Sequence, residues 1–157
     1  MSVELIKDQA YQVNDLITSY ILLHNNIIKN TSSLKCLFLK VDFEEPYMQS
    51  KDMLNRFKKK KDELCELQNK LEKTIDKDKK KYLKQLMRLV EKVSKAVQIL
   101  VERQKVHYQK SLGDKRNWKE FPRIQKEYKH AIAQYMEEKN KLNSLCLLVS
   151  CQVSIDG

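Results

Sequence analysis

The amino-acid sequence predicts an all-α protein, an elongated antiparallel three-helix coiled coil or bundle with a long central helix. The chain has 157 residues, a third of them charged, yet it contains only two Gly and two Pro. Sheet-containing domains need turn residues every ten residues or so, and so few breakers therefore favour a small number of long helices. Apolar residues also recur at alternating intervals of four and three, which is the heptad pattern of a coiled coil.

Two breaks divide the chain into three predicted helices. The first helix covers about residues 3–43 and ends at Glu44-Glu45-Pro46, where the proline disfavours a continuing helix. The central helix covers about residues 50–111, a length of roughly 90 Å at 1.5 Å per residue. Short connections force neighbouring helices to run antiparallel, so the outer two should fold back on the central one.

The third predicted helix covers about residues 117–150. It follows the glycine-containing break around Gly113, and Asn117 with Glu120 resembles a capping box that would start it. Residues 151–157 form a tail in which Asp156 is the only charged side chain. We expect the whole chain, residues 1–157, to form one helical unit.

The stretch Leu16–Ile28 is apolar on more than one side of its helix. If the first two helices form a hairpin whose paired positions sum to about 94, this stretch faces residues 66–78, which offer only a thin apolar stripe. Exposed Leu and Ile forfeit about 1.5 to 3 kcal/mol each, so either the third helix or another protein chain should cover them.

The candidate partner interface combines this stretch with a second apolar stripe on the central helix and with the only Trp, which lies at the long break. The Trp either packs the start of the third helix onto the core or anchors a partner. The predicted interface residues are Leu16, Ile17, Tyr20, Ile21, Leu23, Ile27, Ile28, Val97, Val101 and Trp118.

Positive charge is concentrated on the central helix of a chain whose net charge is +10. One lysine of this group, Lys61, falls at a heptad core position between Phe57 and Leu64. The charge either keeps a solvated helix soluble or attracts an anionic membrane, an acidic protein or, with less support, nucleic acid. The basic residues are Lys58, Lys59, Lys60, Lys61, Lys77, Lys79, Lys80, Lys81, Lys84 and Arg88.

The sequence carries no motif typical of catalysis, cofactor binding or metal binding. Two glycines cannot form a phosphate-binding loop, and Cys36, Cys65, Cys146 and Cys151 lack the CxxC spacing of zinc sites, so we expect reduced thiols. His24, on the heptad face of the first helix, is expected to be a buried polar residue. We therefore expect a protein that is not an enzyme, with no cofactor and no small-molecule substrate.

The sequence also predicts an intracellular protein of the cytoplasm, cytoskeleton or nucleus. The N-terminus lacks the basic start and apolar core of a signal peptide. The most apolar run, Leu16–Ile28, is about thirteen residues long, whereas a membrane span needs roughly twenty. We expect neither secretion nor a transmembrane segment.

These features together favour a non-enzymatic coiled-coil scaffold subunit of a cytoskeletal, centrosomal, kinetochore or meiotic chromosome assembly. The expected partner is a second copy or another coiled-coil chain. Three long antiparallel helices with a basic surface are also similar in architecture to BAR-type curvature modules, which implies a membrane-surface alternative. A non-specific nucleic-acid binder is the third hypothesis.

Overall fold

The protein is described by a computed structural model that covers residues 2–30 and 41–146. Over these residues the chain is all-helical, as predicted, with four long α-helices, one short 3-10 helix and no strand. The elements are α1 (Ser2–Asn30), α3 (Glu44–Leu71), α4 (Lys77–Ser111), η1 (Trp118–Glu120) and α5 (Phe121–Cys146).

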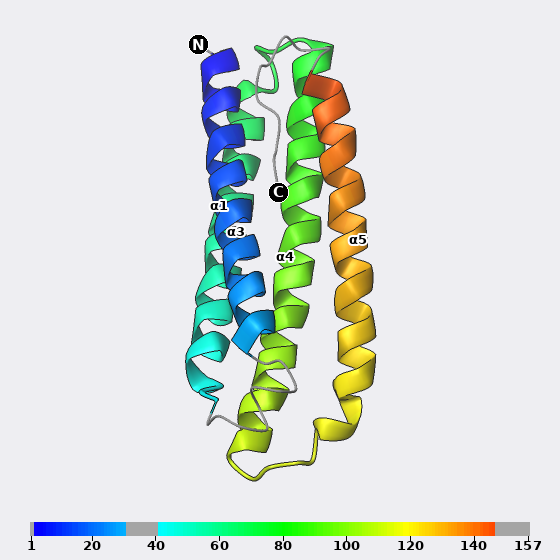
Figure 1. Cartoon of the computed structure of the whole chain (residues 1–157). Helices are drawn as coiled ribbons and strands as arrows, with labels where there is room; N and C mark the ends of the chain where they lie inside the picture. Colours follow the sequence, from blue (N-terminus) through cyan, green and yellow to red (C-terminus); the bar gives the residue numbers. More distant parts are fainter. Residues whose placement is uncertain (1, 31–40, 147–157) are drawn as a thin grey trace.

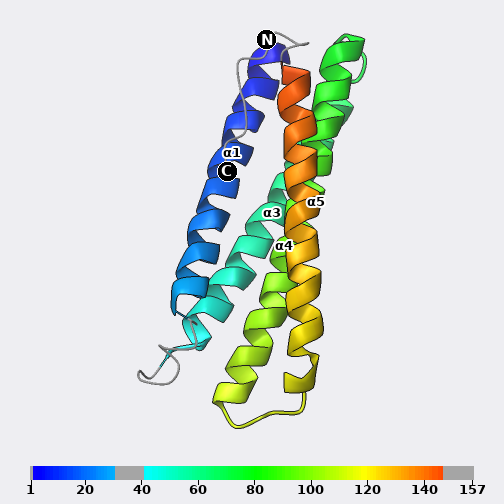
Figure 2. The same cartoon turned by 45° about the vertical axis from the view of Figure 1, so that its right-hand side comes forward.

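The long helices lie side by side, and successive ones run in opposite directions (Figure 1). Helix α4 packs along its length against both α3 and α5, whereas α1 closes the bundle with less extensive backbone contact to α3 and α4. Turning the molecule shows α1 at the edge of the bundle beside α3 (Figure 2). The side of α1 that faces away from the core is therefore open.

The prediction of one helix over residues 50–111 is wrong, because the chain turns back between Leu71 and Lys77. Thr74 and Ile75 donate backbone hydrogen bonds to the Leu71 carbonyl, and the Asp76 carboxylate caps the next helix by accepting from the Lys79 amide at 2.9 Å. Folding back lets α3 cover α4, and it buries both Leu71 and Ile75. The result is a bundle of four long helices and not of three.

The predicted pairing of the first two helices is also wrong. Lys60 bonds Gln9 and Tyr20 packs on Phe57, so paired positions of α1 and α3 sum to about 70 to 77 and not to 94. The offset arises because α1 ends at Asn30, well before the predicted end at residue 43, and α3 begins at Glu44. Residues 31–40 lie outside the described part of the chain.

The core follows the predicted heptad positions closely in α4. Six of them are fully buried, and Val90 and Val97 of the neighbouring stripe are buried as well, because α4 is surrounded by three helices. Helix α4 is thus the central element, as expected for the second half of the predicted central helix. The six heptad residues are Tyr82, Leu86, Leu89, Val93, Ala96 and Leu100.

The turn between α4 and α5 uses Gly113 in a left-handed conformation with φ +90°. The predicted capping box is not formed, since Asn117 makes no side-chain capping bond and donates instead to Gln109 Oε1 at 3.2 Å. A single 3-10 turn follows, and α5 begins at Phe121. The predicted end of this helix at residue 150 lies outside the described residues.

Candidate protein-binding surfaces

A long groove separates α1 from α3 on the open side of the bundle. One part of it has a volume of about 590 Å³, and an adjoining part of about 310 Å³ shares Ser19 and Arg56 with the first. Along α1 the two parts run from Gln12 to Asn26, a length of about 21 Å at 1.5 Å per residue. The groove is therefore as long as four turns of a helix.

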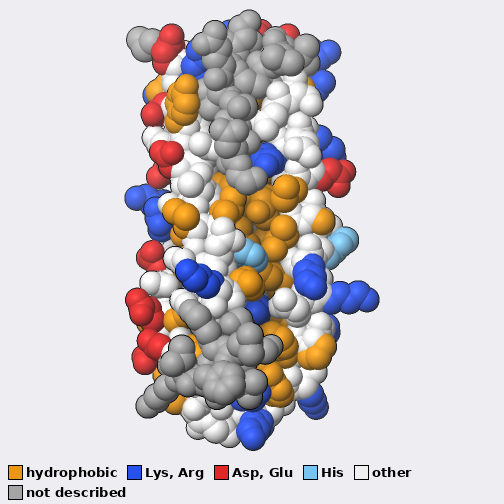
Figure 3. All heavy atoms as spheres, viewed as in Figure 1, with side chains coloured by type: hydrophobic (Ala, Val, Ile, Leu, Met, Phe, Trp, Pro, Cys, Tyr) orange, Lys and Arg blue, Asp and Glu red, His pale blue; other side chains and the backbone are white. Residues whose placement is uncertain are grey.

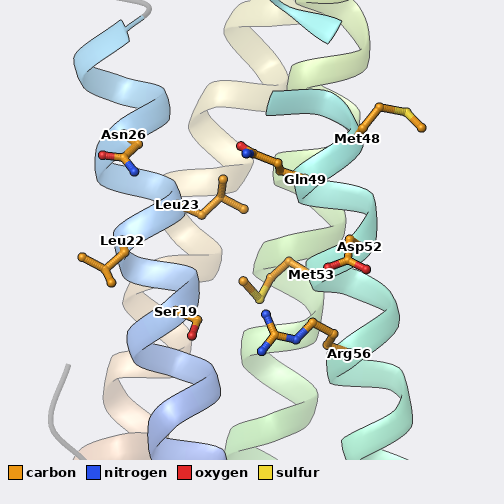
Figure 4. Close-up of a pocket in the computed structure, with 9 residues that line it drawn as sticks. All are labelled: Ser19, Leu22, Leu23, Asn26, Met48, Gln49, Asp52, Met53 and Arg56. Atoms are coloured by element: carbon orange, nitrogen blue, oxygen red, sulfur yellow. The ribbon is translucent and has the colours of Figure 1, made fainter. Parts of the chain in front are cut away.

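An apolar band crosses the wider part of this groove. Leu23 and Met53 line its inside, and Leu22 and Met48 form its outer edges, where they point away from the groove (Figure 4). Leu22 is 60% exposed and Met48 is 54% exposed. Large apolar side chains at such exposure on both edges of one groove are typical of surfaces that bind other molecules.

Polar and charged side chains border the apolar band at both ends. Asn26 and Gln49 lie on one end, and Ser19 and Arg56 lie on the other (Figure 4). The narrower part adds further charged groups of both signs, including Asp15 and Lys59. An apolar centre with a polar rim is the usual composition of a protein-binding surface.

The deepest polar group of the groove is Lys60, which is only 8% exposed. Its ammonium donates to the side-chain oxygens of Gln9 and Gln12 on α1 and pairs with Glu63 on its own helix. Lys61, which the heptad pattern placed in the core, is exposed. That prediction is wrong because α1 packs on the side of α3 that carries Lys60, one residue before the predicted position.

A chain of hydrogen bonds joins α1 to α5 in the interior. The hydroxyls of Tyr20 and Tyr128 are 2.6 Å apart, and Tyr128 is also 2.7 Å from Nδ1 of His24. Burial raises the pKa of both tyrosines and lowers the pKa of His24, so all three are neutral at pH 7. His24, expected to be a buried polar residue, is half-buried and takes part in this hydrogen bond.

A buried arginine lies next to these groups. Arg103 is 5% exposed, and its guanidinium donates to Gln125 and Gln104 and lies 5.4 Å from the Phe121 ring. No carboxylate of the described residues pairs with it. The heptad pattern contains a signal for this residue, because Arg103 follows Leu100 by three positions, but the predicted core positions end at Leu100.

The interface residues predicted on α1 fall into two groups. Leu16, Ile17, Tyr20 and Ile27 are buried in the protein's own core, and Tyr20 meets both α3 and α5. The third predicted helix does therefore reach the apolar stretch of α1. The residues that stay accessible are Ile21, Leu23 and Ile28, together with Leu22, which was not in the predicted set.

Two of the other three predicted interface residues lie on α4 and one on η1. Val97 is buried, and Val101 and Trp118 are half-buried. The Trp118 ring stacks on the Phe121 ring with 4.8 Å between the ring centres, and the Lys110 ammonium lies over the Trp118 ring, 3.6 Å from its centre. Its contacts fit the first of the two predicted roles, packing the start of α5 onto the bundle.

Hydrophobic side chains also gather along the middle of the face that lies between α1 and α5 (Figure 3). The same face carries Lys and Arg mainly toward its edges. Several apolar residues of these two helices are only partly buried, among them Ile21 on α1 and Ile132 on α5. Of the predicted interface stretch, Leu16 and Leu23 line the α1–α3 groove.

The predicted basic residues do not form one cluster. Lys58, Lys59 and Lys61 are exposed on α3, whereas Lys60 points to α1. The remaining members lie on α4, where Lys79 is half-buried and pairs with Asp76, and the others are exposed. Helix α4 holds eleven Lys and Arg against three Asp and Glu, so it carries a net charge of +8.

Within residues 2–30 and 41–146, no group of three or more His, Cys, Asp or Glu side chains is placed to hold a metal ion. None of the helices over the same ranges combines the length and apolarity that crossing a membrane requires. Cys65 is a half-buried free thiol, and the side chains of Cys36, Cys146 and Cys151 lie outside the described part of the chain.

Comparisons with known proteins add no functional assignment. No protein-family model, no curated protein and no solved structure matches this chain.

Proposed function

We propose that this chain is a non-enzymatic interaction subunit that binds an amphipathic helix of another protein in the groove between α1 and α3. The observation that carries the proposal is the apolar surface of this groove, where Leu23 and Met53 line the inside and Leu22 and Met48, 60% and 54% exposed, extend it over the two outer edges. Leaving such side chains in water is unfavourable, and a partner that covers them gains about 25 cal/mol for each Å² of apolar surface buried.

The dimensions of the groove favour a helix as the occupant. A length of about 21 Å accommodates four helical turns, and a helix presents apolar side chains at intervals of three and four along one face. One apolar side chain of the partner would lie between Leu23 and Met53. Charged residues of both signs along the groove, such as Asp15 and Arg56, favour a partner helix that carries charges of both signs on its flanks.

The proposal is tested by exchanging single apolar side chains for charged ones. Leu22→Glu and Met48→Glu should each abolish co-purification of the partner from the native cell without changing the helical content or the unfolding midpoint. Leu112→Glu is the matched control, because Leu112 is 69% exposed but lies in the turn after α4. Equal recovery of the same proteins by all three variants would refute the groove as the binding site.

The same variants test whether the occupant of the groove is a second copy of this chain. If the groove binds another copy of this chain, sedimentation should show a dimer that Leu22→Glu converts to a monomer. A monomer for the unchanged chain, with partner capture lost in Leu22→Glu, would assign the groove to a different protein.

A further inference from the structure

The exposed side of α4 carries its charges in one line. Apart from Asp78 and Lys80 in the first turn, its exposed residues between Lys77 and Glu102 follow one another at alternating intervals of four and three, on the side away from the core. We define this line as the α4 stripe. Its members are Lys77, Lys81, Lys84, Arg88, Glu91, Lys95, Gln98 and Glu102.

The cations of the α4 stripe have no ion-pair partners among the described residues. Neither Lys77, Lys81, Lys84, Arg88 nor Lys95 forms a salt bridge, whereas Arg123 on α5 reaches three carboxylates, one of them Glu102 of the stripe. Successive cations at intervals of three or four also repel one another on a helix. With five cations against the carboxylates of Glu91 and Glu102, this side of α4 therefore holds net positive charge that a bound anion would stabilise.

We infer that the α4 stripe binds an acidic helical segment of a second partner protein, on a surface that shares no residue with the α1–α3 groove. The cations from Lys77 to Arg88 lie about 4.5 to 6 Å apart along the axis, and Lys95 follows Arg88 by about 10.5 Å, with Glu91 between them, so the five cations extend over about 27 Å. A helix with Glu or Asp at every third and fourth position presents carboxylates at the same spacing, as in the charged flanks of coiled coils.

Other anions fit the stripe less well. A membrane-surface helix needs large apolar side chains beside its cations, and the α4 stripe has none. Single-stranded nucleic acid is bound through aromatic stacking, and the stripe has no aromatic residue. Arg88 is its only arginine, the residue that binds phosphate with two parallel hydrogen bonds, and Glu91 would repel a phosphate backbone.

The test uses a labelled synthetic helical peptide with Glu at alternating intervals of three and four, and it measures fluorescence anisotropy with the full chain at about 50 mM salt. Binding should weaken by about tenfold or more in Lys81→Glu/Lys84→Glu/Arg88→Glu, and it should fade as salt rises. The control Lys51→Glu/Lys119→Glu/Lys129→Glu, which reverses three exposed lysines on three other elements, should change the affinity less than about twofold.

Competing ligands and a check that the variant is folded complete the test of the inference. Tighter binding of phosphatidylserine vesicles or of duplex DNA than of the peptide would overturn the inference, and so would equal weakening by the control variant. The stripe variant should keep the helical content of the unchanged chain, because all three substituted side chains are exposed. Leu22→Glu should leave peptide binding unchanged, which separates a failure here from a failure of the groove.

Discussion

The hydrogen bonds of Tyr128 give the sharpest quantitative test of how α1 is held in the bundle. Tyr128→Phe removes one hydroxyl but leaves two groups without their partner, the buried hydroxyl of Tyr20 and Nδ1 of His24. A hydrogen bond contributes about 1 kcal/mol net, and a buried group left unpaired costs about 1 to 3 kcal/mol. The free energy of unfolding should therefore fall by about 2 to 3 kcal/mol, or about 5 to 10 °C in melting temperature.

Tyr20→Phe is the matched control for this prediction. It removes a hydroxyl from the same pair, but Tyr128 keeps its bond to His24, so the loss should be only about 1 kcal/mol. Urea unfolding followed by circular dichroism measures both variants, and the double variant should show a coupling of about 1 kcal/mol. Losses for the two single variants that agree within about 0.5 kcal/mol would refute this account of the Tyr20–Tyr128–His24 chain.

The remaining predictions concern the core register, the helix break and pH. Lys60→Ala should destabilise the protein by about 1 to 2 kcal/mol in urea unfolding, because it removes a buried donor that joins α1 to α3. Lys61→Ala should change the stability by less than about 0.5 kcal/mol. A larger loss for Lys61→Ala than for Lys60→Ala would show that Lys61 is the core residue, as the heptad pattern predicted. Asp76→Ala should lower the free energy of unfolding by about 1 kcal/mol, because it removes the cap on the Lys79 amide, whereas Asp76→Asn should keep most of this stability. Equal losses for the two variants would show that the capping bond is unimportant. Burial, with two nearby cations, lowers the pKa of His107 from 6.5 to about 4, so the unfolded chain binds this proton more readily. The stability that depends on a neutral His107 should be complete above pH 6.5 and lost as pH falls toward 4. A His107→Gln variant should show a shallower decline over that range, and an unchanged slope would contradict the assignment.

The helical class and most of α4 could be predicted because they depend on local signals. Residues such as Tyr82, Leu86 and Leu89 repeat at core spacing, and glycine and proline are scarce enough to exclude sheets. The turn at 72–76 was missed because it contains neither Gly nor Pro. Its signal was the capping residue Asp76, and the reason for the turn is tertiary, since only folding back lets α3 cover α4.

The surface residues were harder to predict than the core. Apolar residues of the Leu16–Ile28 stretch look alike in the sequence, and only the packing of α3 and α5 decides that Tyr20 is buried while Leu22 is exposed. The shift of the buried lysine from Lys61 to Lys60 has the same origin. A heptad pattern identifies one helix face, but a helix with three neighbours buries more than one face, and its register depends on all of them.

The central claim is that the α1–α3 groove binds a helix of another protein, and site-specific photo-crosslinking in the native cell tests it most directly. A photoreactive residue placed at Leu22 should form a covalent adduct with one protein, and the crosslinked site should map to an amphipathic helix of that protein. The same group at Leu112 should give no such adduct. Equal crosslinking at both positions, or none at Leu22, would contradict the account.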